Sequence, residues 1–142
     1  MTEHMPFKIG DEFRQLKALW ITRSPLRMMT SQNFDQMLHL RALNLYENQI
    51  DSLTSDVFHR LPNLEYLDLD NNHISDLHED LFIYMPDLTV LRMRANNLKK
   101  LSQEIFKNNQ KLEEIHLNDN KLKQIDVDFN SFDDLLAVNL EG

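Results

Sequence analysis

The sequence predicts an α/β repeat solenoid, with a parallel β-sheet along its concave side and short helical or irregular turns along its convex side. One observation is a leucine that recurs every 24 residues and once after 23, at Leu16, Leu40, Leu64, Leu88, Leu112 and Leu135. The other is the pattern that each leucine opens, L-x-x-L-x-L-x-x-N-x-L, in which Ile or Met replaces some leucines and Ser24 replaces the first Asn. Self-similarity at a fixed short period is the signature of a repeat architecture.

These anchors divide the chain into an N-terminal flank or degenerate repeat, residues 1–15, and a repeat domain, residues 16–142. The repeats of that domain are residues 16–39, 40–63, 64–87, 88–111, 112–134 and the incomplete 135–142. A second column lies six residues before each following leucine and holds Phe34, Phe58, Phe82, Phe106 and Phe129. At the front, Phe13 occupies the column of Met37, Leu61 and Met85, whereas Gly10 stands where the phenylalanine column would continue. Residues 1–15 are therefore expected to be the tail of a degenerate coil or an extension.

Each pattern contains a short strand with one buried face. Apolar and variable residues alternate after the anchor, and a period of two sends them to opposite faces of a strand. We therefore expect six parallel strands, beginning near residues 18, 42, 66, 90, 114 and 137. One coil cannot bury its apolar interior alone, so the coils stack and each is stabilised by its neighbours.

The Asn column and the outer turns have structural explanations. Asn48, Asn72, Asn96 and Asn120 are predicted to form a ladder whose amides satisfy buried backbone groups. Ser or Thr precedes three outer turns, Thr30–Phe34, Thr54–Phe58 and Ser102–Phe106, which favours single helical or 3₁₀ turns. Lys107, Asn109 and His59 are expected on the convex outside.

Composition excludes several function classes. The formal net charge of −8 opposes nucleic-acid binding, which needs a basic surface, and no apolar run is long enough to span a membrane. There is no cysteine and no glycine-rich phosphate loop, so we expect no cysteine-bound metal, no nucleotide and no cofactor. An open concave sheet also supplies neither a water-excluding pocket nor oxyanion donors, so we expect no enzyme.

The repeat with its F-x-x-L-P-x-L segment, Phe58–Leu64, resembles the 24-residue "typical" class of leucine-rich repeats. Residues 96–101 and 106–109 resemble insect secreted repeat proteins, including mosquito immune factors. The resemblance implies a leucine-rich-repeat horseshoe in a secreted protein or receptor ectodomain, with a role in innate immunity. Such proteins usually carry a signal peptide and cysteine-rich caps, so this chain is expected to be a fragment.

The variable positions of the strands supply the candidate binding residues. Trp20, Tyr46 and Tyr66 place large aromatic side chains on a surface where the fold does not require them, and Trp and Tyr are enriched in binding hot spots. The competing interpretation is that these aromatics shield sheet edges or pack under a missing cap.

A charge step and a histidine complete the candidate surface. Asp68 and Asp70 on one strand face Arg92 and Arg94 on the next. Cross-strand stabilisation is the favoured interpretation of these pairs, with ligand contact as the alternative. His116 lies between Glu114 and Asn118, but too few strong ligands surround it for a metal site.

We therefore expect a non-enzymatic scaffold that binds a protein ligand through its concave face, outside the cell. The alternatives are a structural or assembly module that forms homo- or hetero-oligomers, and a cytoplasmic interaction scaffold, which the absence of cysteine and of an export signal permits.

Overall fold

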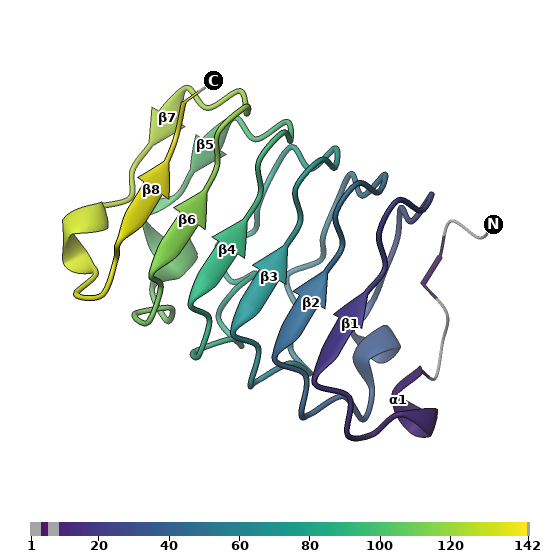
Figure 1. Cartoon of the computed structure of the whole chain (residues 1–142). Coiled ribbons are helices and arrows are strands. Elements are labelled where there is room, and N and C mark those ends of the chain that lie inside the picture. The colour runs from purple at the N-terminus through teal and green to yellow at the C-terminus, as the bar shows by residue number, and fades with distance from the viewer. Residues whose placement is uncertain (1–3, 6–8, 142) are drawn as a thin grey trace.

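The computed structural model describes residues 4–5 and 9–141 and has the predicted solenoid architecture (Figure 1). Six three-residue strands form one parallel sheet in the order β1-β2-β3-β4-β6-β8. They are β1 Ala18–Trp20, β2 Ala42–Asn44, β3 Tyr66–Asp68, β4 Val90–Arg92, β6 Glu114–His116 and β8 Ala137–Asn139. All six begin where the repeat predicts, and equivalent repeat positions are paired across the sheet, as in Leu43 with Leu67.

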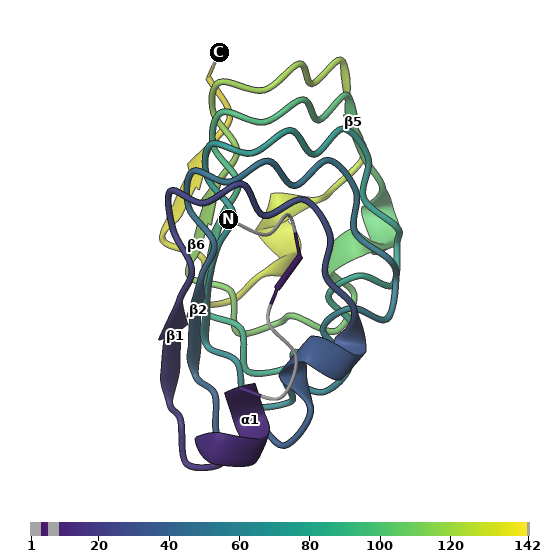
Figure 2. The same ribbon diagram turned by 90° about the vertical axis from the view of Figure 1, so that its right-hand side faces the viewer.

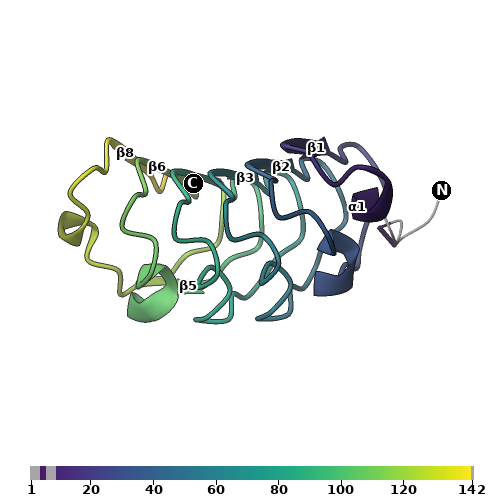
Figure 3. The same cartoon turned by 90° about the horizontal axis from the view of Figure 1, so that it is seen from below.

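The outer side carries short elements opposite the sheet (Figures 2 and 3). They are the 3₁₀ helices η1 Ser31–Phe34, η2 Gln103–Phe106 and η3 Phe129–Ser131 and a second sheet of β5 Lys100–Leu101 with β7 Gln124–Ile125. The Ser102 hydroxyl accepts a hydrogen bond from the Glu104 amide at 3.3 Å, as expected of an N-cap. Of the three expected helical turns, Thr54–Phe58 forms only hydrogen-bonded turns.

The core is one apolar column between the sheet and the outer turns. Phe34, Phe58, Phe82 and Phe106 are at most 1% exposed. Phe82 and Phe106 stack with centroids 5.8 Å apart, whereas Phe106 meets Phe132 edge-on at 6.3 Å. Phe129, assigned to this column from its spacing, is only partly buried. The shorter repeat therefore brings Phe132 into contact with the column.

The asparagine ladder is confirmed. Asn72 donates through Nδ2 to the carbonyls of Leu45 at 3.0 Å and Leu69 at 3.1 Å, and its Oδ1 accepts from the Ile50 amide at 3.0 Å. Asn96 and Asn120 make the equivalent bonds one and two coils later. The Oδ1 of Asn48 has no partner among the described residues, so the first rung is incomplete next to Ser24.

Two further buried asparagines occupy positions that are apolar in other coils. Asn109 was expected on the convex surface, and that expectation is wrong: it is 0% exposed and donates to the carbonyls of Phe82 at 2.9 Å and Met85 at 2.8 Å. Its position is equivalent to those of Leu61 and Met85, so the repeat alignment already carried the signal. The other is Asn33, whose Nδ2 donates to the Met5 carbonyl at 3.2 Å and whose Oδ1 accepts from the Thr30 amide at 2.7 Å.

The described residues 9–12, ahead of β1, pack against the first coil. The helix α1 Ile9–Glu12 contacts η1, and Gly10 is buried there. A Cβ atom on Gly10 would collide with the Asp35 carbonyl, which explains the glycine. Phe13, whose column is buried in the following coils, is 56% exposed.

We predict that Asn72→Ala destabilises the protein by about 1–3 kcal/mol, because it leaves buried backbone groups without partners. Asn71 is the neighbouring control, but its φ of 55° favours Asn over Ala, so the matched substitution is Asn71→Gly. Urea denaturation of both variants tests the ladder, and equal losses in the free energy of unfolding would contradict it.

A column of left-handed residues follows the strands and includes Ala95, with φ 53°. This conformation costs an alanine about 1–2 kcal/mol, whereas glycine adopts it without penalty. Ala95→Gly should therefore raise the free energy of unfolding by up to about 1 kcal/mol. The matched change Ala42→Gly, inside β2, should lower the free energy of unfolding. Thermal denaturation measures both variants, and a change of the same sign in the two would refute a role for the left-handed conformation of Ala95.

Candidate binding surface

The predicted residues all belong to the concave sheet or to the residues that follow its strands, and the structure divides them into three groups. The first is aromatic and lies at the N-terminal end. Trp20, at the end of β1, is 57% exposed and pairs in register with Asn44 of β2. Tyr46 is half-buried, and its amide donates to the Asn44 Oδ1 at 2.8 Å. Asn44 therefore holds the backbone that carries Tyr46 beside the strand that carries Trp20.

The second group is a polar network centred on Asp68, a carboxylate only 5% exposed. Its Oδ2 accepts from the Tyr66 hydroxyl at 3.1 Å and the Asn44 Nδ2 at 3.2 Å, and its Oδ1 accepts from the Asp70 amide at 2.9 Å. The Tyr66 hydroxyl is thus directed towards Asp68 on its own strand. The sequence prediction omitted Asn44, although its position in the middle column beside Asp68 identified it.

Asp70 anchors both arginines of the charge step. It is 1% exposed, its Oδ1 accepts from the Arg94 amide at 2.6 Å, and its Oδ2 lies 3.3 Å from the Arg92 Nε and 3.4 Å from an Arg94 guanidinium nitrogen. The side chains of Arg92 and Arg94 remain 35% and 40% exposed. The carboxylates are therefore covered by their neighbours on the concave face and act as fixed acceptors, while the arginines are the charges that the surface presents.

Burial raises the pKa of Asp70 above its ordinary value, because the charged form loses hydration. The Arg94 amide and the two guanidinium groups oppose this rise, whereas the neighbouring Asp68 adds to it. Burial and Asp68 also raise the pKa of the Tyr66 hydroxyl, which consequently stays a hydrogen-bond donor. Both pKa shifts have the direction expected of groups buried in an internal polar network.

His116 forms the third group, two strands from Asp70. Its Nε2 lies 3.0 Å from the Glu114 carboxylate on the same strand, whereas Asn118 turns to Asp119 at 2.7 Å. Within residues 4–5 and 9–141, no three His, Cys, Asp or Glu side chains are grouped so as to hold a metal ion. The same described residues contain no helix long and apolar enough to cross a membrane.

Stacked coils with one parallel sheet and variable residues on its open face define the solenoid class of binding scaffold. The family model described as leucine-rich repeat matches residues 14–74 and 86–142. The chain belongs to the leucine-rich-repeat family. Domains of this family generally bind proteins and do not catalyse reactions.

Several solved structures are similar to the chain. The leucine-rich-repeat domain of APL1 is 28% identical with a TM-score of 0.85, over 92% of this chain and 34% of that one. A structure of the LRIM1/APL1C complex gives the same identity and TM-score and covers 92% of this chain and 24% of that one. Both agree with the resemblance to insect immune repeat proteins. The chain spans about a third or less of these relatives.

A chain in the structure of an octameric complex of latrophilin 3, Unc5D and FLRT2, the last represented by its leucine-rich repeats, is also similar. It is 25% identical with a TM-score of 0.77, over 86% of this chain and 38% of that one. Comparison with curated protein sequences found no match.

The raised pKa of Asp70 predicts a pH dependence of stability. A carboxyl whose pKa is raised by folding contributes stability below its ordinary pKa of 3.8 and loses that contribution as the pH rises through the raised value. The free energy of unfolding of the wild type, minus that of Asp70→Asn, should therefore fall over the pH range above 3.8 in which Asp70 ionises. Urea denaturation across this range measures the difference. A rise with pH would mean that the arginine pairs outweigh burial.

Proposed function

We propose that the chain is a protein-binding scaffold whose concave face holds a macromolecular partner. The observation that carries the proposal is Trp20, which is 57% exposed on the edge strand β1. At the equivalent positions of β2, β3 and β4, Asn44, Asp68 and Arg92 are held by side-chain hydrogen bonds. A large exposed aromatic on a rigid surface gives contact area at a small entropic cost.

The charge distribution adds a second feature of the partner. Because Asp68 and Asp70 are occupied by internal bonds, the groups left to a ligand are the guanidinium edges of Arg92 and Arg94. Such edges bind carboxylates and carbonyls through several N–H donors. The partner therefore has an apolar patch opposite Trp20 and Tyr46 and acceptor groups opposite the arginines. His116, beside Glu114, extends the same surface.

We also propose that the parent protein is secreted or is the ectodomain of a receptor, with a role in innate immunity. Within the chain, we propose that residues 1–15 flank a repeat domain at 16–142. The proposal is supported by the 24-residue repeat class and by similarity to the leucine-rich-repeat domain of APL1. Chains of the LRIM1/APL1C complex and of the complex that contains FLRT2 are similar as well. A second candidate function is assembly with other copies or chains. It draws on the exposed Leu136, 80%, and Leu140, 36%, on either side of β8.

The test begins with a display library of extracellular protein domains selected against the chain. Affinities of a selected binder are then measured for wild type, Trp20→Ala, Tyr46→Ala and Tyr66→Ala. We expect Trp20→Ala to weaken binding by about 30-fold or more, as for a hot spot of about 2 kcal/mol, with the melting temperature unchanged. Tyr66→Ala should also lower stability, because its hydroxyl belongs to the Asp68 network.

Tyr84→Ala is the matched control, since Tyr84 is an aromatic 45% exposed outside the sheet, in edge contact with His59. Arg94→Gln should reduce the association rate and its salt dependence more than the residence time. A binder that is insensitive to the Trp20 and arginine variants but lost on Tyr84→Ala, or on Leu136→Ser, would reject the concave-face proposal, and the second result would favour assembly.

A further inference from the structure

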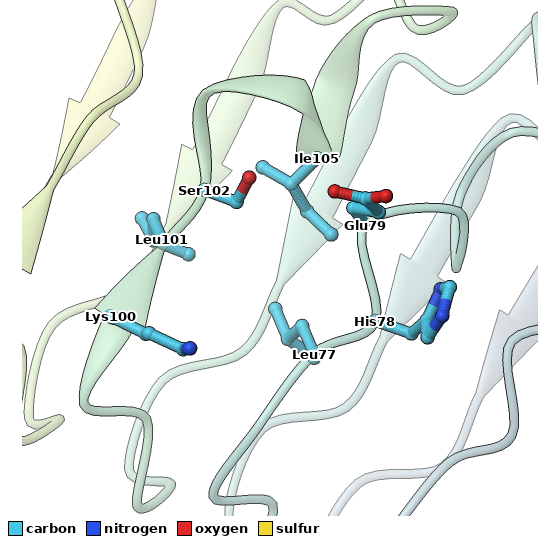
Figure 4. A pocket seen from close by; sticks show the side chains of 7 residues that line it. All are labelled: Leu77, His78, Glu79, Lys100, Leu101, Ser102 and Ile105. Atoms are coloured by element: carbon cyan, nitrogen blue, oxygen red, sulfur yellow. The ribbon is translucent and has the colours of Figure 1, made fainter.

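A pocket of about 300 Å³ opens on the convex side, away from the concave sheet (Figure 4). It is lined by Leu77, His78 and Glu79 from one coil and by Lys100, Leu101, Ser102 and Ile105 from the next. The proposed concave-face function uses none of these residues.

The pocket lies between two neighbouring coils. The backbone bond from the Asn97 amide to the Ile74 carbonyl, 2.8 Å, still joins them. Beyond it, the described backbone shows no further bond between residues 75–77 and 99–102. The following pair of coils does continue, with bonds from Lys123 to Lys99 and from Asp126 to Leu101 as β5 pairs with β7. The strand β5 thus pairs with β7 on one side, and the pocket lies on its other side.

The pocket has an apolar floor and a polar rim. Leu101 and Ile105 are 1% and 2% exposed, and Leu77 is half-buried beside them. Figure 4 places Lys100 and Ser102 on the β5 side and His78 and Glu79 on the opposite side. A floor of this kind suits an aliphatic group about the size of a leucine side chain, whose removal from water provides the binding energy.

The β5 side of the pocket continues into a group of four lysines, Lys99, Lys100, Lys121 and Lys123, which we call the lysine patch. All four are exposed, and no ion pair joins any of them to another described residue. Two other lysines of the chain are neutralised, Lys107 by Asp80 at 2.9 Å and Lys111 by Asp87 at 2.6 Å. In a chain of net charge −8, this patch is a local excess of positive charge.

We infer that the pocket and the lysine patch together bind an acidic peptide segment of a partner protein, with one aliphatic side chain in the pocket and neighbouring carboxylates over the lysines. Both halves of the surface are needed for this conclusion. A pure polyanion would use the lysines and leave the apolar floor empty, whereas a neutral apolar ligand would gain nothing from the lysines.

The charges also orient the segment. Glu79 repels carboxylates from the side opposite Lys100, so the acidic residues extend over β5 and β7 and not over His78. The His78 Nδ1 accepts from the Asp80 amide at 3.1 Å, which leaves Nε2 as the protonated nitrogen and a donor for a peptide carbonyl at that rim.

The test uses the 142-residue chain and a fluorescent synthetic peptide with a central leucine flanked on each side by two aspartates. Fluorescence anisotropy gives the affinity, and amide chemical shifts map the contact. We expect shifts at residues 77–79, 100–105 and 121–124, with those of the concave strands unchanged. Replacing the peptide's leucine by glycine, or its aspartates by asparagines, should weaken binding about tenfold each.

Two variants of the protein separate the pocket from the patch. Leu77→Phe fills the pocket and should abolish the preference for the leucine peptide, while the double variant Lys100→Glu, Lys123→Glu should abolish the preference for the acidic peptide. Lys17→Glu is the matched control, because Lys17 is also exposed but lies in the first coil. Thermal denaturation reports whether Leu77→Phe folds, and the lysine variant keeps the test decisive if it does not.

Absence of binding at millimolar peptide would overturn the inference. So would equal affinity for the acidic and neutral peptides, or equal weakening by Lys17→Glu. Binding of a sulfated polysaccharide that matches the peptide in affinity and ignores Leu77→Phe would identify the surface as a general polyanion site. Because the Trp20 variants leave this surface intact, failure here is distinguishable from failure of the concave-face proposal.

Discussion

The structure depends on hydrogen bonds between asparagine side chains and the backbone where each strand ends. At that turn the chain leaves the sheet, and its amides and carbonyls are buried without regular pairing. Each ladder asparagine bridges its own turn to the preceding one, as Asn72 does by joining the carbonyls of Leu45 and Leu69. Since an unpaired buried backbone group is costly, the register of one coil on the next is set there.

That register explains where the charged residues of the surface meet. Because coils stack in equivalent positions, residues 24 apart become neighbours, and ion pairs form between Arg23 and Glu47 at 2.9 Å and between Arg41 and Glu65 at 2.9 Å. Each such pair is well exposed and contributes little to stability. Arginines and lysines that find a partner in the next coil are neutralised, and the lysine patch is conspicuous because its members do not. The stacking of the coils thus determines which charged side chains gain an ion-pair partner from the next coil.

The concave sheet contains some polar side chains that stabilise the fold and others that remain available for binding. Its central strands carry two carboxylates that are nearly inaccessible and therefore act as internal acceptors for Tyr66, Asn44 and the two arginines. This arrangement supports the structural interpretation of the charge step, while it leaves the guanidinium edges on the surface. No side-chain hydrogen bond joins Trp20 to another residue in the part of the chain that the structure describes, and the proposed binding energy therefore centres on this side chain.

The repeat pattern alone determined the fold, because the buried side of every coil must be apolar at the same positions and the buried turn must be polar at one. Strand positions, the asparagine ladder and most of the phenylalanine column therefore followed from spacing. For the candidate binding surface, the repeat pattern predicted only which residues share one face of the sheet. Only the tertiary structure decided that Asp68 and Asp70 are buried and that Phe132 contacts Phe106. Those outcomes depend on how far adjacent coils approach, as does the pocket beside β5, and a linear pattern does not encode that distance.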